Sequence, residues 1–286
     1  IKNTMKRILL PTDFSENAYN AIAYALQLYK QETCTFYLLH TYTPAMISAG
    51  SMMDSYSAIT LQEAAKENAD KKMDALKEKL EASFKNPKHS LKYATSFNML
   101  ISEMELIIEE KGIDLVIMGT QGATGAKEIF LGTHTMYAIK KMKVPVLAVP
   151  ENFSFEEPKE ILFPTDYNFD NDNKYLPILR ELCEQHVSEL NMLNVYYGTA
   201  LTEKQQEAKT FLDNYFIRNA HLFHEAEGTD VLGAVEQFQM KSKINLIVMI
   251  HNKHNFLENL LFKPVINQVV YHTNVPFLVI PSVERQ

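Results

Sequence analysis

The chain has 286 residues and a mass of 32.8 kDa, which suits two domains of about 140 residues better than one small domain. Hydrophobic residues make up 46% and charged residues 22%, an ordinary globular composition that excludes extensive disorder. The formal net charge of -7 argues against a protein that coats nucleic-acid phosphates, and the strand-sized apolar runs predict no membrane-spanning segment.

The first half of the chain alternates strand-like and helix-like segments. Short apolar runs predict strands, and apolar side chains three or four residues apart predict amphipathic helices. Ser15 can cap the first helix, and Gly112 is suited to end a later one. In chain order we expect a strand at 7–10, a helix after Ser15, a strand at 34–40, a helix at 58–84, a strand at 90–94, a helix at 98–111, a strand at 113–118, a helix at 133–141 and a strand at 144–149.

The order of these elements indicates the fold class. Strands that are apolar on both faces and alternate with helices are typical of a parallel sheet covered on each side. Right-handed crossovers then make a doubly wound open sheet the simplest arrangement. The second half repeats the same order with a shorter helix at 202–217. We therefore predict an α/β protein.

Short motifs from the first half recur in the second. Ile8–Phe14 (ILLPTDF) matches Ile161–Tyr167 (ILFPTDY), and Val144–Pro150 (VPVLAVP) matches Val275–Pro281 (VPFLVIP). The first match is displaced by 153 residues. The second is displaced by 131, as is a third match between Gly112–Met118 (GIDLVIM) and Lys243–Met249 (KINLIVM), so the second half has lost 22 residues between its first and fourth strands. Ordered matches with a consistent deletion indicate a duplicated domain.

The two copies, which we place at residues 5–150 and 158–286, each end in an apolar strand. Val144–Val149 and Pro276–Ile280 are the last strands of their sheets and lack the charged residues that usually protect an exposed edge. We expect the copies to pack together through these strands as an intramolecular pseudo-dimer. The sequence does not decide whether whole chains pair further into a homodimer.

Cysteine usage indicates a reducing compartment. The chain has two cysteines, Cys34 and Cys183, and no recognisable secretion signal. Because disulfide-stapled secreted domains are rich in cysteine, we expect a cytoplasmic protein. Both thiols are then small buried or half-buried apolar groups.

Polar or glycine-containing segments follow three strands of the first half. They are Pro11-Thr12-Asp13, Thr41-Tyr42-Thr43 and Gly119-Thr120-Gln121-Gly122. Open parallel sheets bind ligands at the carboxyl ends of their strands, so these segments predict a binding site. The third segment leads to Gly132 and Thr133, where a helix begins.

Glycines let backbone N–H groups approach a phosphate, and a helix start adds free donors. Thr133 can cap that helix and present its hydroxyl to phosphate. The residues alone indicate an anion-binding loop, with a tight turn without ligand as the alternative. The pattern is neither G-x-x-x-x-G-K-[ST] nor G-x-G-x-x-G.

The glycine pattern resembles that of a known family. Gly119-x-x-Gly122, nine further residues and then Gly132-Thr133 are similar to the G-2x-G-9x-G-(S/T) signature of the universal stress protein (UspA-like) family. The motifs at 11–15 and 144–150 resemble that family too, so the likeness covers nearly the whole chain as a tandem of two domains. It implies two Rossmann-like or flavodoxin-like domains of adenine nucleotide alpha hydrolase-like type, each with a five-stranded parallel sheet and helices on both faces.

The resemblance also implies a ligand for the first half, which is ATP, with or without Mg2+. The contacts it implies with adenosine come from Pro11, Thr12 and Asp13, and the contact with the adenine edge comes from the main chain of Thr41. The other implied contacts are Met118 and Gly119 along the nucleotide, and Gly122, Gly132, Thr133 and His134 around the phosphates.

The second half departs from this signature. The positions of Gly119, Gly122, Gly132 and Thr133 hold Ile250, Lys253, Lys263 and Pro264. Three glycines have gained side chains and the proline removes a backbone donor, so we expect no ATP in this half. A filled site is the favoured interpretation, and binding of a different anion by the two lysines is the alternative. Asp166 is retained at the position of Asp13, which leaves a partly structural role open for both.

Two histidine pairs, at 221 and 224 and at 251 and 254, do not predict a metal site. The first pair lies on a strand, where residues three apart face opposite sides. The second pair has no cysteine or carboxylate at ligand spacing. We expect ordinary histidines in both.

The sequence is compatible with three functions. The first is a nucleotide-binding stress or signalling protein, and the second is an interaction scaffold for which a ligand is incidental. The third is a slow ATP hydrolase or phosphoryl transferase, with Lys127, Lys140 and His134 as candidate groups. Because no Walker-B acid or kinase catalytic loop is present, binding without fast turnover is favoured. The expected partner is an adenine nucleotide, with neither nucleic acid nor membrane.

Overall fold

The computed structural model of the chain describes residues 5–43, 55–120, 132–196, 198–227, 231–251 and 274–282. Its strands are β1 (Lys6–Pro11), β2 (Cys34–Thr41), β3 (His89–Ser96), β4 (Leu115–Gly119), β5 (Val146–Val149), β6 (Glu160–Pro164), β7 (Glu189–Tyr196), β8 (His221–Glu227), β9 (Leu246–His251) and β10 (Phe277–Pro281). Its helices are α1 (Glu16–Leu28), α2 (Ser55–Ser83), α3 (Leu100–Lys111), α4 (Thr133–Lys141), α5 (Leu176–His186), α6 (Glu203–Tyr215) and α7 (Val231–Lys241). The residues discussed above that lie outside the described ones are Gln121, Gly122, Lys127, Lys253, His254, Lys263 and Pro264.

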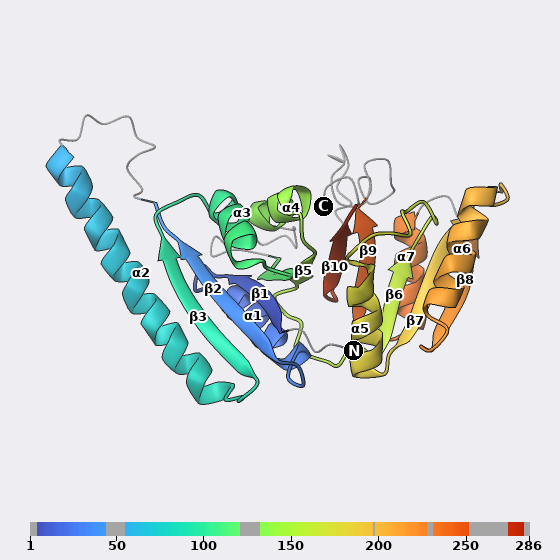
Figure 1. Cartoon of the computed structure of the whole chain (residues 1–286), viewed down its shortest axis with the longest axis horizontal. Coiled ribbons are helices and arrows are strands. Elements are labelled where there is room, and N and C mark those ends of the chain that lie inside the picture. The colour runs from blue at the N-terminus through green and yellow to red at the C-terminus, as the bar shows by residue number, and fades with distance from the viewer. Residues whose placement is uncertain are drawn as a thin grey trace.

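The ten strands form one sheet in the order β3-β2-β1-β4-β5-β10-β9-β6-β7-β8 (Figure 1). Within each set of five the strands are parallel, as expected from the alternation of strands and helices. The two sets meet where β5 and β10 pair antiparallel, with Leu147 opposite Leu278. The predicted α/β fold, with helices on both faces of parallel sheets, is confirmed.

The offsets found in the sequence connect structurally equivalent residues. Ile8 of β1 pairs with Leu115 of β4, and Ile161 of β6 pairs with Leu246 of β9. The equivalent strands of the two sets therefore have the same neighbours in the same register. This makes a residue-by-residue comparison between the halves meaningful.

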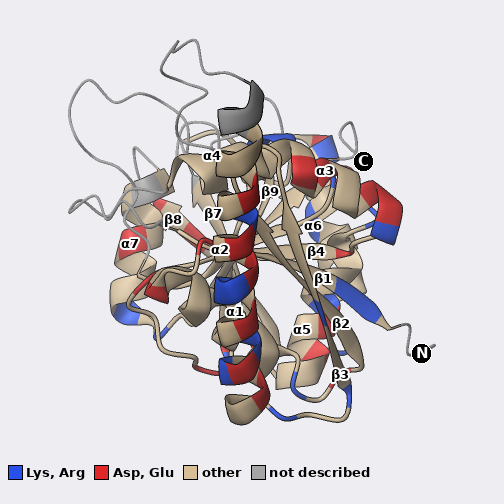
Figure 2. Ribbon diagram, turned by 90° about the vertical axis from the view of Figure 1, so that its left-hand side faces the viewer, with Lys and Arg blue, Asp and Glu red and all other residues tan. Residues whose placement is uncertain are grey.

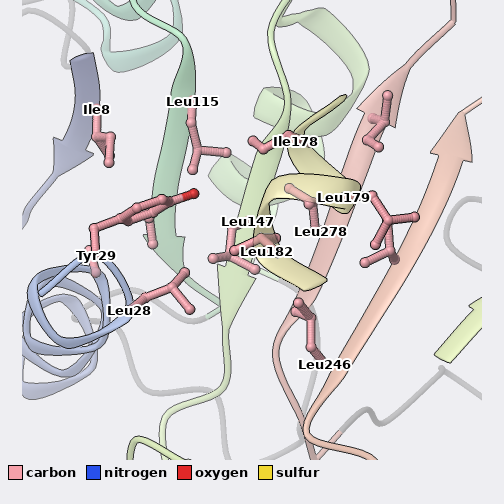
Figure 3. Packing of buried hydrophobic residues seen from close by; sticks show 14 of the residues in the cluster. Ile8, Leu28, Tyr29, Leu115, Leu147, Ile178, Leu179, Leu182, Leu246 and Leu278 are labelled. Carbon is pink, nitrogen blue, oxygen red and sulfur yellow. The ribbon is translucent and has the colours of Figure 1, made fainter. Parts of the chain in front are cut away.

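The helices divide between two apolar layers. The buried residues of α1, α2, α5 and α6 pack on one face of the sheet, and those of α3, α4 and α7 pack on the other. The first layer runs through both halves, since Tyr29 at the end of α1, Leu147 of β5 and Leu182 of α5 belong to one cluster (Figure 3). The two halves consequently share a continuous core rather than touching at a polar surface.

Local signals explain several element ends. The Ser15 hydroxyl accepts a hydrogen bond from the backbone N–H of Ala18 and caps α1, and Gly112 ends α3 in the left-handed region at φ 60°. Thr202 and Gln205 form a capping box at the start of α6. The helix expected at 133–141 has those bounds, and the others differ by a few residues at their ends.

The long helix α2 turns a charged face to solvent (Figure 2). It carries two ion pairs, each between residues one turn apart: Lys66 with Asp70 at 3.2 Å and Lys71 with Glu67 at 2.6 Å. Exposed pairs of this kind add little stability. The helix is instead held by the apolar stripe that includes Met73 and packs on the sheet.

The connection between the halves is anchored to α1. The side-chain amide of Asn20 donates to the carbonyls of Pro150, Glu151 and Phe153, at 3.2, 3.3 and 3.1 Å. The carbonyl of Pro281 at the end of β10 accepts from Asn173 in the equivalent position, at 2.8 Å. An asparagine thus fixes the end of the last strand in each half.

Candidate functional site

The segment after β1 is a tightly bonded turn. The Thr12 N–H donates to the carbonyl of Leu39 at 2.8 Å, and the Thr12 hydroxyl accepts from the N–H of Phe14 at 3.0 Å. A carboxylate oxygen of Asp13 accepts from the N–H of Ser15, also at 3.0 Å. Phe14 has a φ of 66°, so the chain reverses sharply before α1 begins. Thr12 is buried and Asp13 is exposed beside it.

His40, near the end of β2, holds this turn from the neighbouring strand. Its Nδ1 is 2.7 Å from the carbonyl oxygen of Thr12, and its ring centroid is 4.3 Å from that of Phe14. Lys72 of α2 places its ammonium 5.9 Å from the Phe14 ring centroid. Burial lowers the pKa of His40, and nearby Lys72 adds to this, whereas the Thr12 carbonyl and Asp13 oppose it.

Thr41 and Tyr42 lie at the end of β2, beside the end of β3. Thr41 is half-buried, and the N–H of Tyr42 donates to the carbonyl of Ser96 at 2.9 Å. The ring centroids of Tyr42 and Phe97 are 5.8 Å apart. The main chain at Thr41 is therefore held from the β3 side, where Thr41 pairs with Ser96.

The end of β4 is crowded by α1. Met118 and Gly119 are buried, and a Cβ at Gly119 would lie 1.8 Å from Oδ1 and 2.7 Å from Cγ of Asn17. This glycine is required by the close approach of α1, a reason that the loop pattern did not reveal. Its counterpart Ile250 has a buried side chain within the apolar layer.

The first turn of α4 is bonded to the end of β4. The Gly132 N–H donates to the carbonyl of Thr120, and the Thr135 hydroxyl donates to the carbonyl of Gly119 at 2.7 Å. Thr133 and His134 are exposed on this turn. The start of a helix, with its free amides, consequently lies beside the carboxyl end of the sheet.

The expectation that Thr133 caps α4 is wrong. Gly132 is the N-cap residue, with φ -55° and ψ 145°, and Thr133 is already the first helical residue. Among the described residues no side chain accepts a hydrogen bond at this helix start, and its first turn holds no acidic residue. Within the described part of the chain no side chain satisfies these amides, in contrast to α1, which Ser15 caps.

The sheet brings the predicted residues of these segments to one edge. The carboxyl ends of parallel β1, β2 and β4 are neighbours, so Asp13, Thr41 and Gly119 lie at the ends of adjacent strands. Gly132 and Thr133 are carried there by the contacts of α4 with β4. His40 and Lys72 also belong to this edge, and the sequence did not indicate either residue. His40 comes just before the polar segment at 41–43, and Lys72 is distant along the chain.

The second half reproduces the turn but not the glycines. Thr165 accepts from the N–H of Tyr167 at 3.0 Å, and Asp166 accepts from the N–H of Asn168 at 2.9 Å. Tyr167 has a φ of 58°, close to that of Phe14. The turn around Asp13 is thus a property of the fold in both halves, and the glycine segment is what distinguishes them.

The two histidines on β8 bond to different partners, and both cysteines are buried. His221 bonds to Asp213 and His224 to Asn191, so the two point to different partners, as expected for strand residues three apart. Within the described residues no group of three or more His, Cys, Asp or Glu side chains could hold a metal ion. Both cysteines are buried and free, as predicted.

Comparison with known proteins matches the Universal stress protein family to residues 4–150. The chain belongs to the universal stress protein family. The universal stress protein MJ0577 of Methanocaldococcus jannaschii is 31% identical over 157 residues, which are 50% of this chain and 94% of that protein. The universal stress protein MJ0531 of the same organism is 27% identical over 150 residues, 52% of this chain and 84% of that protein.

Solved structures support the fold over the full length. A universal stress protein from Archaeoglobus fulgidus superposes with a TM-score of 0.66 at 17% identity and covers 97% of this chain and 99% of its own. A functionally unknown protein, PA1789, from Pseudomonas aeruginosa gives 0.60 at 13% identity, with 99% and 95% covered. No helix in the described part of the chain combines the length and apolar character needed to cross a membrane.

Proposed function

We propose that this universal stress protein binds ATP at the carboxyl edge of the sheet in its first half, and acts as a stress-response or signalling binding protein. The observation that carries the proposal is the start of α4, which no described side chain caps and which Gly132 and Thr135 hold against the end of β4. Free amides and the helix dipole favour an anionic group there. The glycine signature between Gly119 and Thr133 supports a triphosphate as that group.

The adenosine end of the nucleotide lies toward β1 and β2 in this proposal. Pro11, Thr12 and Asp13 contact adenosine, and the main chain of Thr41 meets the adenine edge. Met118 and Gly119 lie along the nucleotide. The phosphates are then surrounded by Gly122, Gly132, Thr133 and His134.

Mg2+ would be bound mainly by the phosphates. The described residues provide no cluster of acids or histidines able to hold a metal ion on their own. Mg2+ commonly binds through one or two carboxylates together with substrate phosphates and water. The proposal therefore stands with or without the ion.

Binding without fast turnover is the form of the proposal that the residues favour. Lys140 lies in the last turn of α4, about 10 Å along the helix axis from Thr133, so it is far from the helix start. His134 is exposed on the first turn and remains a contact to phosphate. Efficient phosphoryl transfer needs a positioned metal, a base and charge clamps together.

The second half serves as a structural partner in this account. Ile250 occupies the position of Gly119 with a buried side chain, so this half does not bind ATP in the same way. We further propose that residues 5–150 and 158–286 form an intramolecular pseudo-dimer through β5 and β10, whose pairing and shared core support it. Two buried free thiols fit the reducing cytoplasm as its location.

Calorimetric titration of two variants tests the assignment of the site. Gly122→Val introduces a side chain into the glycine signature and should abolish ATP binding while the fold is retained. Lys253→Gly is the matched change in the second half and should leave the affinity for ATP unchanged. Equal losses in the two variants, or normal binding by Gly122→Val, would contradict a single site in the first half.

A further inference from the structure

We propose that His40 is a positioning residue for the nucleotide: through the carbonyl of Thr12 it holds the Asp13 turn in place for adenosine. This inference rests on the proposed function and extends it to a side chain that the family signature does not include. Asp13 itself is exposed and meets the ligand, whereas His40 acts one residue behind it.

Thr12 is fixed at both ends of its backbone. Its N–H donates to the carbonyl of Leu39, and its own carbonyl accepts from Nδ1 of His40 at 2.7 Å. A carbonyl oxygen only accepts, so Nδ1 carries the hydrogen. Because the Thr12 carbonyl belongs to the peptide unit that leads into Asp13, the His40 bond sets the orientation of that unit.

The second contact of His40 is with the other side of the turn. Its ring packs on that of Phe14, with 4.3 Å between centroids, and Phe14 adopts the uncommon φ of 66°. His40 therefore holds the residue before Asp13 by a hydrogen bond and the residue after it by ring contact. The charged groups that face His40 are Asp13 on the turn and Lys72 on α2.

The second half contains the same tether with a different side chain. Pro11 pairs with Leu39 and Pro164 with Leu193, so the next residues on those strands, His40 and Asn194, are equivalent. The amide of Asn194 donates to the carbonyl of Thr165 at 2.9 Å. A donor at this position thus fixes the turn in both halves, and histidine and asparagine are interchangeable for that hydrogen bond.

This equivalence gives two matched substitutions of His40. His40→Phe keeps an aromatic ring against Phe14 but removes the hydrogen-bond donor. His40→Asn keeps a donor, as Asn194 does, but removes the ring. Asn194→Leu removes the tether of the second half and reports the purely structural cost of losing such a bond.

The experiment measures affinity by calorimetry for ATP and for inorganic tripolyphosphate, together with the thermal unfolding midpoint. For His40→Phe we expect ATP affinity to fall about tenfold, the size of one lost hydrogen bond. Tripolyphosphate affinity should stay the same, since it depends on the α4 end of the site. His40→Asn should keep ATP affinity within about threefold of the unmodified protein. Asn194→Leu should lower the unfolding midpoint and leave ATP affinity unchanged.

Each failure has a distinct meaning. Absence of ATP binding by the unmodified protein would overturn the proposed function and this inference with it. Unchanged ATP affinity in His40→Phe would overturn the inference alone, as would equal losses for ATP and tripolyphosphate. If His40→Phe does not fold, His40→Asn decides: loss of ATP binding in that folded variant overturns the positioning role.

Discussion

The backbone of Gly119 lies against the side chain of Asn17, so closely that a Cβ on Gly119 would be 1.8 Å from Oδ1 of Asn17. The backbone oxygen of Asn17 would be 3.2 Å from the same Cβ. Gly119 thus ends β4 and admits the first turn of α1 at the same point. The contact links the packing of the core to the edge where the proposed nucleotide binds.

Gly119→Ala should therefore destabilise the fold. The added methyl group must displace Asn17 or shift α1, and overpacking of this kind costs about 1–3 kcal/mol. Urea denaturation followed by circular dichroism measures the change in the free energy of unfolding. A free energy of unfolding equal to that of the unmodified protein would contradict this expectation and show that α1 can shift without loss of stability.

A double-mutant cycle separates this clash from other effects. Asn17→Ala removes the two closest atoms, Oδ1 and Cγ, and so should relieve most of the strain in Gly119→Ala. The double variant should be more stable than the sum of the two single losses indicates. Strict additivity would mean that Asn17 is not what excludes a side chain at Gly119.

Periodicity and repeats predicted the fold well because they record burial. The helix at 133–141, the cap at Ser15 and the end of α3 at Gly112 all follow from local chemistry that is visible in the sequence. The reason for glycine at position 119 could not be predicted from the sequence, because Asn17 approaches Gly119 only in the folded chain.

The candidate site was partly predictable from the order of the parallel strands. Segments at the carboxyl ends of parallel strands meet at one edge, which places Asp13, Thr41 and Gly119 together. His40 was not predicted, because its contact with the Thr12 carbonyl depends on strand register. The cap expected from Thr133 was wrong by one residue, since helix starts are set by backbone angles that a propensity does not fix.

A substitution in the second half that weakens the shared core should also destabilise the first half. Leu278 is buried on β10 and lies opposite Leu147 of β5. Leu278→Ala should lower the free energy of unfolding by about 2–5 kcal/mol through the cavity it leaves. Because the core is continuous, hydrogen exchange should speed up in the globally protected amides of β1 and β4 as well as in β9.

Leu222→Ala supplies the control for that experiment. Leu222 lies on β8 and is 48% exposed, so its truncation should change stability by less than about 0.5 kcal/mol. Faster exchange confined to β6–β10 in Leu278→Ala would contradict a common core and indicate that the halves unfold separately.

Acid should destabilise the protein through His186. Burial lowers the pKa of His186 from its ordinary value of 6.5, and Lys159 and Lys30 act in the same direction, while Glu157 and the Leu28 carbonyl oppose them. A base with a lowered folded pKa binds more protons when unfolded, so its stabilising contribution is complete above 6.5 and is lost as the pH falls below that value.

His186→Gln tests this origin of the pH dependence. The free energy of unfolding, measured at about pH 5.5 and about pH 7.5, should fall less on acidification in the variant than in the unmodified protein. The remaining dependence comes from other groups, including His40 and His89, whose pKa values burial also lowers. An identical drop in both proteins would assign the effect to those groups instead.

Native mass spectrometry of the intact chain with added ATP counts the nucleotides bound to each molecule, and so distinguishes one site from two or none. We expect one ATP for each unmodified chain, one for Lys253→Gly and none for Gly122→Val. Two equivalent nucleotides in the unmodified chain, or none at all, would contradict it.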